Sequence, residues 1–274
     1  MSHNNQKKIA VINDFSGFGR CSIAVALPII SAMKIQCCPV PTSIFSNHTG
    51  FSSFFYSDYT EHMDAYIDEW KKLDLQFEGI CTGFLGSVKQ IEIVERFLQH
   101  FKTARTTVIM DPVMGDYGKL YPTYSPKLAQ NMHRLVRYAD ILTPNLTEAC
   151  ILTEAPYCAD YDKKVLTAMC DTLSAQGPEK IVISGIQIGD YLGNFVYQRG
   201  RTPHLVKALK IGVNRSGTGD VFSSIIAAEA VNGSDFLASV QKATDFISKT
   251  IAYTMEQEIP VTDGVCFEQF LQEL

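Results

Sequence analysis

Short apolar runs alternate with longer, helix-like segments along almost the whole of this 274-residue chain. Such runs are typical of strands that are buried on both faces, as in a parallel sheet. Six of them lie at 8–12, 35–40, 79–86, 107–110, 140–142 and 180–185. The alternation predicts one doubly wound α/β domain spanning residues 1–274, with a mostly parallel sheet and right-handed crossovers.

The spacing of apolar residues and the positions of turn residues predict further strands and helices. The stretches 190–198 and 202–211 flank the turn Arg199–Arg201 and are expected to form an antiparallel pair. The helix-like segments have apolar residues at helical spacing. They lie at 21–33, 58–72, 90–101, 125–138, 159–176, 234–257 and 267–274.

The segment Asn214–Asp220 contains the sequence G-T-G-D and precedes a small, apolar helix candidate at 221–230. Gly217 and Gly219 allow a ligand to approach the backbone closely. The start of a helix has unpaired N–H groups and a partial positive charge, so it favours an anion. Asp220 could serve there as a general base for a hydroxyl that attacks a phosphate. The alternative is an ordinary glycine loop whose acidic residue stabilises the first helical turn.

A turn-rich loop, Asn13–Gly19, follows the first strand. Ligands of open α/β sheets bind at the carboxyl ends of the strands, and Asp14 lies at such an end. A dinucleotide site is disfavoured, because the third glycine of G-x-G-x-x-G falls on Ser22 and no acidic residue follows at the required spacing.

The segment 41–51 interleaves aromatic and hydrogen-bonding side chains, among them Phe45, His48 and Thr49. Apolar faces with a few polar groups describe a pocket for a flat, polar ring. An ordinary surface loop is the alternative. Gly83 and Gly86, at the end of the third strand, would let a ligand or another backbone come close.

Acidic residues follow the fourth and fifth strands. Asp111 and Asp116 are natural partners for Mg²⁺ and its waters, although turn aspartates have the same appearance. Asn145 and Glu148 lie three residues apart on one helical turn. They could form a capping box, or Glu148 could point into the cleft and hold metal-bound water.

Composition and charge exclude several classes of protein. A net charge of −5 without a run of Lys or Arg disfavours nucleic acid and anionic membranes as partners. No apolar run reaches the ~18 residues of a membrane span, and the polar N-terminus does not resemble a signal peptide. The eight cysteines are scattered without C-x-x-C, which favours reduced thiols and a cytoplasmic location over disulfides or a zinc site.

Four motifs together resemble the pyridoxal kinases of the ribokinase-like superfamily. These are F-S-N-H-T-G at 45–50, D-P-V-M-G-D at 111–116, T-P-N-L-T-E at 143–148 and G-T-G-D at 217–220. They occur in the family's order and extend over most of the chain. The S-N-H-T-G segment is the specific one, whereas G-T-G-D and the Asn/Glu pair are shared across the superfamily. The resemblance implies a three-layer αβα sandwich.

The resemblance further implies ATP-dependent phosphorylation of the hydroxymethyl group of a vitamin B6 vitamer. Asp220 would take the proton of that hydroxyl, and Gly217, Thr218 and Gly219 would present N–H groups to the developing charge. Asp111 and Glu148 would hold Mg²⁺ through waters. A homodimer and a monovalent cation such as K⁺ are also typical of the family.

The same resemblance implies where the ligands lie. The substrate residues would be Asp14, Ser16, Phe45, His48, Thr49 and Phe84. The ATP residues would be Asp111, Asn145, Ser184, Gly217 and Gly219.

Two departures keep a second substrate open. Asp14 stands where many pyridoxal kinases have serine, and Phe84 where they have tyrosine. The loop around Asp14 also resembles the D-x-S-G-G-x-G loop of hydroxymethylpyrimidine kinases, so that activity is the alternative. Sugar kinases and a cysteine-assisted reaction are disfavoured. A non-catalytic vitamer-binding protein is a further hypothesis, against which Asp220 argues, because binding alone requires no base.

Overall fold

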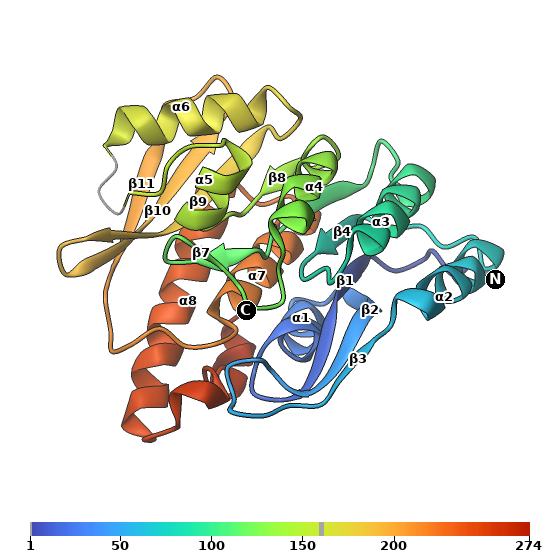
Figure 1. The fold of residues 1–274 in the computed structure, drawn as a ribbon, viewed down its shortest axis with the longest axis horizontal. Coiled ribbons are helices and arrows are strands. Elements are labelled where there is room, and N and C mark those ends of the chain that lie inside the picture. Colours follow the sequence, from blue (N-terminus) through green and yellow to red (C-terminus); the bar gives the residue numbers. More distant parts are fainter. Residues whose placement is uncertain (1, 159–161) are drawn as a thin grey trace.

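The apolar runs form the centre of one large sheet. A computed structural model describes residues 2–158 and 162–274 of the chain (Figure 1). The six central strands of the sheet are parallel, and the positions of the short ones are almost all buried, as a sheet covered on both faces requires. Across the sheet they are β9 (Lys180–Ile188), β8 (Ile141–Leu142), β5 (Thr107–Met110), β4 (Gly79–Thr82), β1 (Lys8–Phe18) and β2 (Gln36–Asn47).

Antiparallel strands lie at both edges of the sheet. β3 (Tyr56–Asp58) pairs with β2, and β10 (Tyr191–Gln198) and β11 (His204–Leu209) extend the sheet beyond β9. The sequence indicated the β10–β11 pair. It did not indicate β3, because a strand of three residues is too short for an alternating pattern to be recognised. The hairpin of β6 (Gly115–Asp116) and β7 (Lys119–Leu120) was missed for the same reason.

Helices cover both faces of the sheet and give two separate hydrophobic cores. One face packs against α1 (Ser22–Ala32), α7 (Thr218–Asn232) and α8 (Phe236–Glu256) (Figure 1). The other packs against α2 (Thr60–Lys72), α3 (Val88–Phe101), α4 (Pro126–Val136), α5 (Leu146–Leu152) and α6 (Lys163–Ser174). This arrangement confirms the expected three-layer αβα sandwich.

β1 and β2 are longer than their apolar runs, which corrects the expectation of loops at 13–19 and 41–47. The two strands stay paired as far as Phe18 and Asn47, with a register shift between Asn13 and Phe15. Pairing with the neighbouring strand satisfies backbone N–H and C=O groups that a loop would leave to water. The strand pairing therefore overrides the local turn preference of these residues.

Two helix boundaries also differ from the expectation. α6 begins at Lys163, after the N-cap Asp162, whose side chain accepts a hydrogen bond from the Val165 N–H. The beginning of the helix expected at 159–176 includes residues 159–161, which lie outside the described residues. The helical segment expected at 267–274 is present as a 3₁₀ helix, η2 (Glu268–Glu273), and a further 3₁₀ helix, η1 (Val261–Asp263), precedes it.

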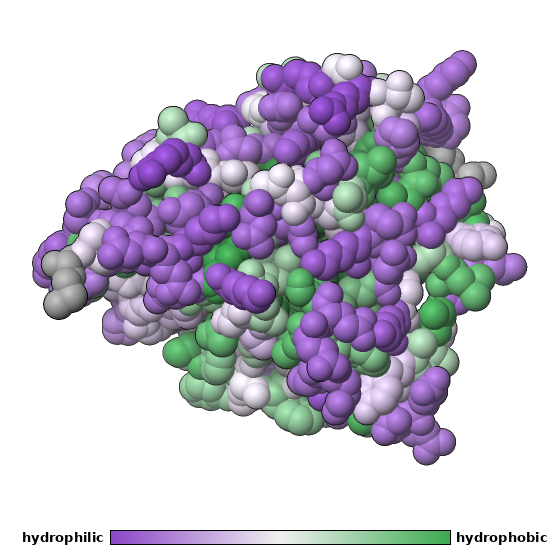
Figure 2. All heavy atoms as spheres, turned by 180° about the vertical axis from the view of Figure 1, so that it is seen from behind, coloured by the Kyte–Doolittle hydropathy of each residue, from purple (hydrophilic) through white to green (hydrophobic). Residues whose placement is uncertain are grey.

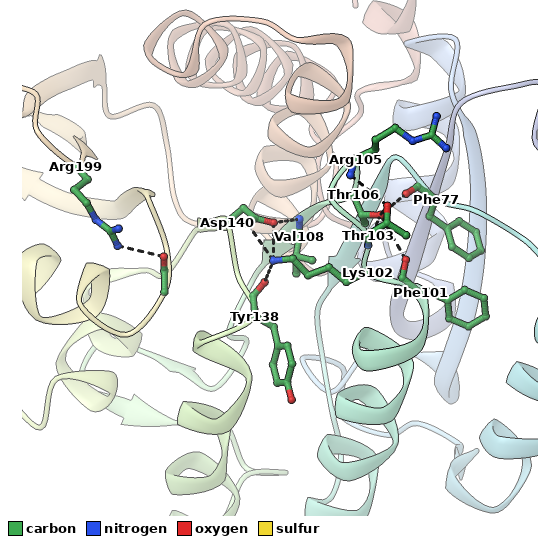
Figure 3. A network of polar contacts seen from close by, with 11 residues as sticks. Phe77, Phe101, Lys102, Thr103, Arg105, Thr106, Val108, Tyr138, Asp140 and Arg199 are labelled. Carbon is green, nitrogen blue, oxygen red and sulfur yellow. Dashed lines mark hydrogen bonds and ion pairs between the residues drawn. The ribbon is translucent and has the colours of Figure 1, made fainter.

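A polar network ties together the amino ends of the parallel strands (Figure 3). Asp140, just before β8, accepts hydrogen bonds from the Val108 N–H at 2.7 Å and from Lys102 Nζ at 3.0 Å. Thr106 Oγ1, just before β5, donates to the Phe77 carbonyl at 2.8 Å. These side chains satisfy backbone groups at the strand starts and leave the opposite, carboxyl ends for a site.

The surface of the protein contains both hydrophilic and hydrophobic residues. Hydrophilic side chains cover most of the face seen in Figure 2, and hydrophobic atoms appear there in separate patches. Within residues 2–158 and 162–274, none of the helices combines the length and the apolar character that crossing a lipid bilayer demands.

Candidate active site

The glycine loop passes directly into α7. Gly217 is the N-cap of this helix and has a φ of 78°, a left-handed conformation that favours glycine. A Cβ there would lie 1.9 Å from the Arg20 carbonyl oxygen, whereas a Cβ on Gly219 would meet nothing within 4 Å. Gly217 is therefore packed against the chain, and Gly219 faces open space at a helix N-terminus that suits an anion.

Asp220 lies in the first turn of α7 and is half-buried. Its Oδ1 accepts a hydrogen bond from Asn13 Nδ2 at 3.2 Å, which joins α7 to β1. Burial raises the pKa of Asp220 to about 6, and the nearby Asp14 carboxylate raises it further, against the hydrogen bonds from Ser22 and Asn13. A carboxylate with such a pKa is a suitable general base near neutral pH.

Asp14 lies close to Asp220, but its own oxygens already have partners. Ser22 Oγ donates to Oδ1 at 2.6 Å, and Ser16 Oγ donates to Oδ2 at 3.0 Å. Burial raises the pKa of Asp14, whose exposed fraction is only 6%. Its role toward a substrate stays a prediction.

The acidic residues after β5 and β8 also converge. Glu148 Oε2 accepts from the Asn145 N–H at 2.8 Å, and Asn145 Oδ1 accepts from the Glu148 N–H at 3.0 Å, so the capping box is present. Glu148 Oε1 accepts from the Met114 N–H at 3.0 Å. Burial raises the pKa of Glu148 to about 8 and, with the charges of Glu148 and Asp220, raises that of Asp111 well above its usual range.

This acidic cluster is compatible with a hard cation. Among the residues that the structure describes, no three His, Cys, Asp or Glu side chains lie close enough together to hold a metal ion directly. Asp111 and Glu148 nevertheless offer oxygen donors, and their mutual repulsion with Asp220 would be relieved by a bound cation. The residues present therefore fit Mg²⁺ held partly through water.

Aromatic rings from three segments form one wall beside β2. Phe45 is 4% exposed, and its ring centroid lies 4.8 Å from that of Tyr56 and 6.1 Å from that of Phe84. Phe84 is half-buried and lies edge-on to Tyr124 at 5.9 Å. Tyr56, on the strand missed by sequence reasoning, thus adds a phenol to the wall expected from Phe45 and Phe84.

His48 has both ring nitrogens engaged within the protein. Nε2 lies 2.6 Å from the Thr262 carbonyl oxygen, and Nδ1 lies 3.1 Å from the Gly50 N–H. Because a carbonyl requires a donor and an N–H an acceptor, these partners select the neutral Nε2–H tautomer. Thr49 beside it is exposed.

Ser184 lies farther along the sheet, next to the cap of α5. It forms an isolated bridge with Asn145, and its N–H donates to the Pro144 carbonyl at 2.9 Å. Asn145 Nδ2 donates to the Gly115 carbonyl at 2.8 Å, which ties this region to the β6–β7 hairpin. These contacts join the segment after β8 to β9 on one side and to the β6–β7 hairpin on the other.

Sequence reasoning missed two residues that anchor these loops. The Arg215 guanidinium is buried under the glycine loop, where Nη1 donates to the carbonyls of Ile259 and Pro260, both at 3.0 Å. Asn13 was quoted only as part of a loop, yet it contacts Asp220. In the sequence, Arg215 is an arginine in a glycine-rich segment and Asn13 is a polar residue after an apolar run. Neither feature reveals that the residue contacts a partner more than 40 positions away.

The three-layer fold, with a carboxylate at a helix N-terminus on the carboxyl edge of the sheet, is consistent with the ribokinase-like class of α/β proteins. The chain belongs to the phosphomethylpyrimidine kinase family, whose family model matches residues 23–263. Both the sequence relatives and the solved structures of similar fold include pyridoxal kinases, as the motifs indicated.

Individual relatives divide between two substrates. A pyridoxal kinase from Arabidopsis thaliana is 32% identical over 199 residues, which cover 69% of this chain and 62% of the relative. The thiamine biosynthetic bifunctional enzyme TH1 of the same plant is 27% identical over 254 residues, covering 90% of this chain and 47% of the relative. The chain therefore spans less than two thirds of the length of both.

A solved structure is more similar over its whole length. The protein from Bacteroides thetaiotaomicron described as a "putative phosphomethylpyrimidine kinase", crystallised with pyridoxal, is 36% identical. Its TM-score with this chain is 0.95, and the match covers 98% of this chain and 96% of that one.

Proposed function

We propose that this protein is an ATP-dependent kinase for the hydroxymethyl group of a vitamin B6 vitamer. The observation that carries the proposal is Asp220, a carboxylate with a raised pKa at the open N-terminus of α7. The aromatic wall of Phe45, Tyr56 and Phe84 gives an adjoining surface for a flat ring. The pyridoxal in the related Bacteroides crystal supports a pyridine ring as the substrate.

In this mechanism Asp220 accepts the proton of the substrate hydroxyl as the hydroxyl oxygen attacks the γ-phosphorus of ATP, the bond to the β,γ-bridging oxygen breaks and ADP leaves. The N–H groups of Gly217, Thr218 and Gly219 stabilise the charge that develops on the transferred group. Asp111 and Glu148 would hold Mg²⁺ through water, and the bound cation would neutralise phosphate charge. Asn145 and Ser184 lie along the nucleotide.

Hydroxymethylpyrimidine kinase is the second candidate. A buried Asp14 beside the site suits an aminopyrimidine or the amine of pyridoxamine, since its two oxygens have further acceptor sites besides those that accept from Ser16 and Ser22. The family model and the TH1 relative favour this substrate. A non-catalytic vitamer-binding protein is the third candidate. It does not explain why a carboxylate stands at the anion site, because binding alone requires no general base.

ATP consumption by the purified protein with Mg²⁺ tests these alternatives directly. Pyridoxal, pyridoxine, pyridoxamine and hydroxymethylpyrimidine are compared at equal concentrations. We expect the highest kcat/KM for a B6 vitamer. A preference for the pyrimidine would replace the first proposal by the second, and binding of a vitamer without turnover of any substrate would support the third.

His48→Ala is expected to raise the KM for the ring substrate about tenfold or more and to leave the KM for ATP nearly unchanged. The imidazole joins the loop after β2 to Thr262, so its loss releases the segment that borders the aromatic wall. Steady-state kinetics with each substrate varied in turn measures the effect. Equal increases in both KM values would mean that His48 has only a structural role.

Asp111→Asn is expected to weaken Mg²⁺-dependent nucleotide binding about tenfold, because one of the carboxylates proposed to hold the metal becomes neutral. Titration calorimetry with ADP, with and without Mg²⁺, measures the change. Asp235→Asn is the control, since Asp235 caps α8 and accepts from the Ala238 N–H. An unchanged Mg²⁺ dependence in Asp111→Asn would remove Asp111 from the metal site.

The remaining expectations also stay proposals. We propose that residues 1–274 act as one kinase domain, because one sheet contains strands from β1 to β11 and the C-terminal helices α7 and α8 pack against it. The family resemblance suggests a cytoplasmic homodimer that uses a monovalent cation such as K⁺. Sedimentation of the purified protein tests the homodimer, and comparing activity in K⁺ and Na⁺ buffers tests the monovalent cation.

A further inference from the structure

Asn13 is a buried amide whose orientation is fixed by its neighbours. Its Oδ1 accepts two backbone hydrogen bonds, from the Asp14 N–H at 2.9 Å and from the Phe84 N–H at 2.8 Å. Because both partners are donors, the oxygen and nitrogen of this amide cannot be exchanged. The Nδ2 group therefore points toward Asp220 Oδ1, 3.2 Å away.

The surroundings of Asn13 leave its side chain no alternative position. Asn13 is only 6% exposed and lies at the register shift in β1. A Cβ on Gly83 would lie 2.5 Å from the Asn13 amide, so the amide packs directly on the backbone after β4. The side chain is held by β1 and the segment after β4, and its single free donor group is directed at α7.

Among the described residues, the side chains with a marked electrostatic influence on Asp220, or under its influence, are acidic or become anionic when they ionise, Asn13 apart. Those that interact with it electrostatically are Asp14 from β1, Cys21 before α1, Cys81 from β4, Asp111 after β5 and Tyr121 after β7. None of these supplies a positive charge. A neutral N–H donor is thus the side-chain contact that favours the ionised form of Asp220.

We propose that Asn13 is a positioning residue for the general base: it holds Asp220 Oδ1 and so fixes the direction in which the carboxylate faces the substrate hydroxyl. This inference rests on the proposed kinase function. Misplacing a reacting group by about 1 Å can cost on the order of 10²-fold in rate. The expected loss is therefore in kcat and not in the affinity for either substrate.

Asn13→Asp and Asn13→Ala test the proposal. Asn13→Asp retains an oxygen for the Asp14 and Phe84 N–H groups and removes the donor, so it changes the contact with Asp220 while keeping the contacts that support the fold. We expect both variants to reduce kcat about 10²-fold, with both KM values within about threefold of the original. The acidic limb of the kcat profile should move to higher pH.

Asn194→Ala is the matched control. Asn194 is a partly buried asparagine whose Nδ2 donates to Thr244 Oγ1 at 2.8 Å, far along the sheet in β10. This variant should lose stability without a change in the pH profile of kcat. Unchanged kcat in both Asn13 variants, or losses confined to KM, would overturn the proposal.

A direct titration separates this proposal from the kinase function. The ¹³C signal of the Asp220 carboxyl, assigned by its absence in Asp220→Asn, reports the pKa of Asp220 without any substrate. We expect Asn13→Ala to raise this pKa and Asn194→Ala to leave it unchanged. If the original protein phosphorylates nothing, the kinase proposal fails, and the titration still decides whether Asn13 controls Asp220. An unchanged pKa in Asn13→Ala would refute that control.

Discussion

Replacing Asp220 by asparagine is expected to lower kcat about 10³-fold while ring binding stays measurable. General-base catalysis contributes roughly 10²- to 10⁴-fold, and asparagine cannot accept the hydroxyl proton. The amide keeps the size of the side chain, so the N-terminus of α7 and the aromatic wall remain in place. Initial rates and equilibrium binding of the vitamer measure the two effects, and normal turnover would contradict the mechanism.

The same variant is expected to be more stable than the original protein at neutral pH. The pKa of Asp220 is about 6 in the folded state, against an ordinary value of 3.8 for an aspartate in the unfolded chain, because burial disfavours the charged form. The folded state therefore binds the proton more tightly than the unfolded state does. This contribution to stability is complete below pH 3.8 and is lost as the pH rises through 6.

Asp220→Asn has no carboxyl to ionise, so it avoids the stability that the original protein loses when Asp220 ionises, which is at most about 3 kcal/mol. Urea unfolding without nucleotide or Mg²⁺ at pH 7.5 and again near pH 4 measures the difference. The gain should be present at pH 7.5 and shrink at the lower pH. A gain of equal size at both values would show that ionisation of Asp220 is not its cause.

Gly217→Ala is the second change with a large expected effect. The new Cβ would be placed 1.9 Å from the Arg20 carbonyl oxygen, and the φ of 78° disfavours any side chain. Backbone must move, either in the glycine loop or in the segment between β1 and α1. Since an anion site depends on aligned N–H groups, we expect kcat to fall about 10²-fold or more and the protein to lose about 2 kcal/mol of stability.

Gly219→Ala is the matched comparison in the same loop. Nothing lies within 4 Å of its added Cβ, so thermal unfolding without ligand should be nearly unchanged. The methyl group would stand in the open space where the phosphate is proposed to bind, and the KM for ATP should rise. Equal losses of stability in the two variants would mean that the contact with Arg20 is not what requires glycine at 217.

Regular elements with a strong local pattern could be predicted from the sequence. β5 begins and ends where the apolar run at 107–110 does, and α3 follows the amphipathic pattern that reaches Phe101. The extension of β1 to Phe18 could not be predicted, because those residues have turn preferences and are strand only through pairing with β2. β3 has only three residues, too few for an alternating pattern to be recognised in the sequence.

The candidate site divides in the same way. G-T-G-D, the capping pair Asn145 and Glu148, and the aspartate after β5 are contiguous motifs, so their chemistry could be proposed from spacing. The contact of Asn13 with Asp220 spans 207 positions, and no local pattern encodes it. The engagement of both His48 nitrogens by Thr262 and Gly50 was equally inaccessible.

Local sequence patterns were sufficient to predict the class of fold, the order of the main strands and helices, and the residue types able to perform phosphoryl transfer. Those features depend on short-range periodicity and on the chemistry of single side chains. Which polar groups face one another, and which already have hydrogen-bond partners, depends on how distant segments pack and could not be predicted from these patterns. The ionisation of Asp220 depends on that arrangement, since burial and the surrounding charges arise when β1, β5 and α7 pack together.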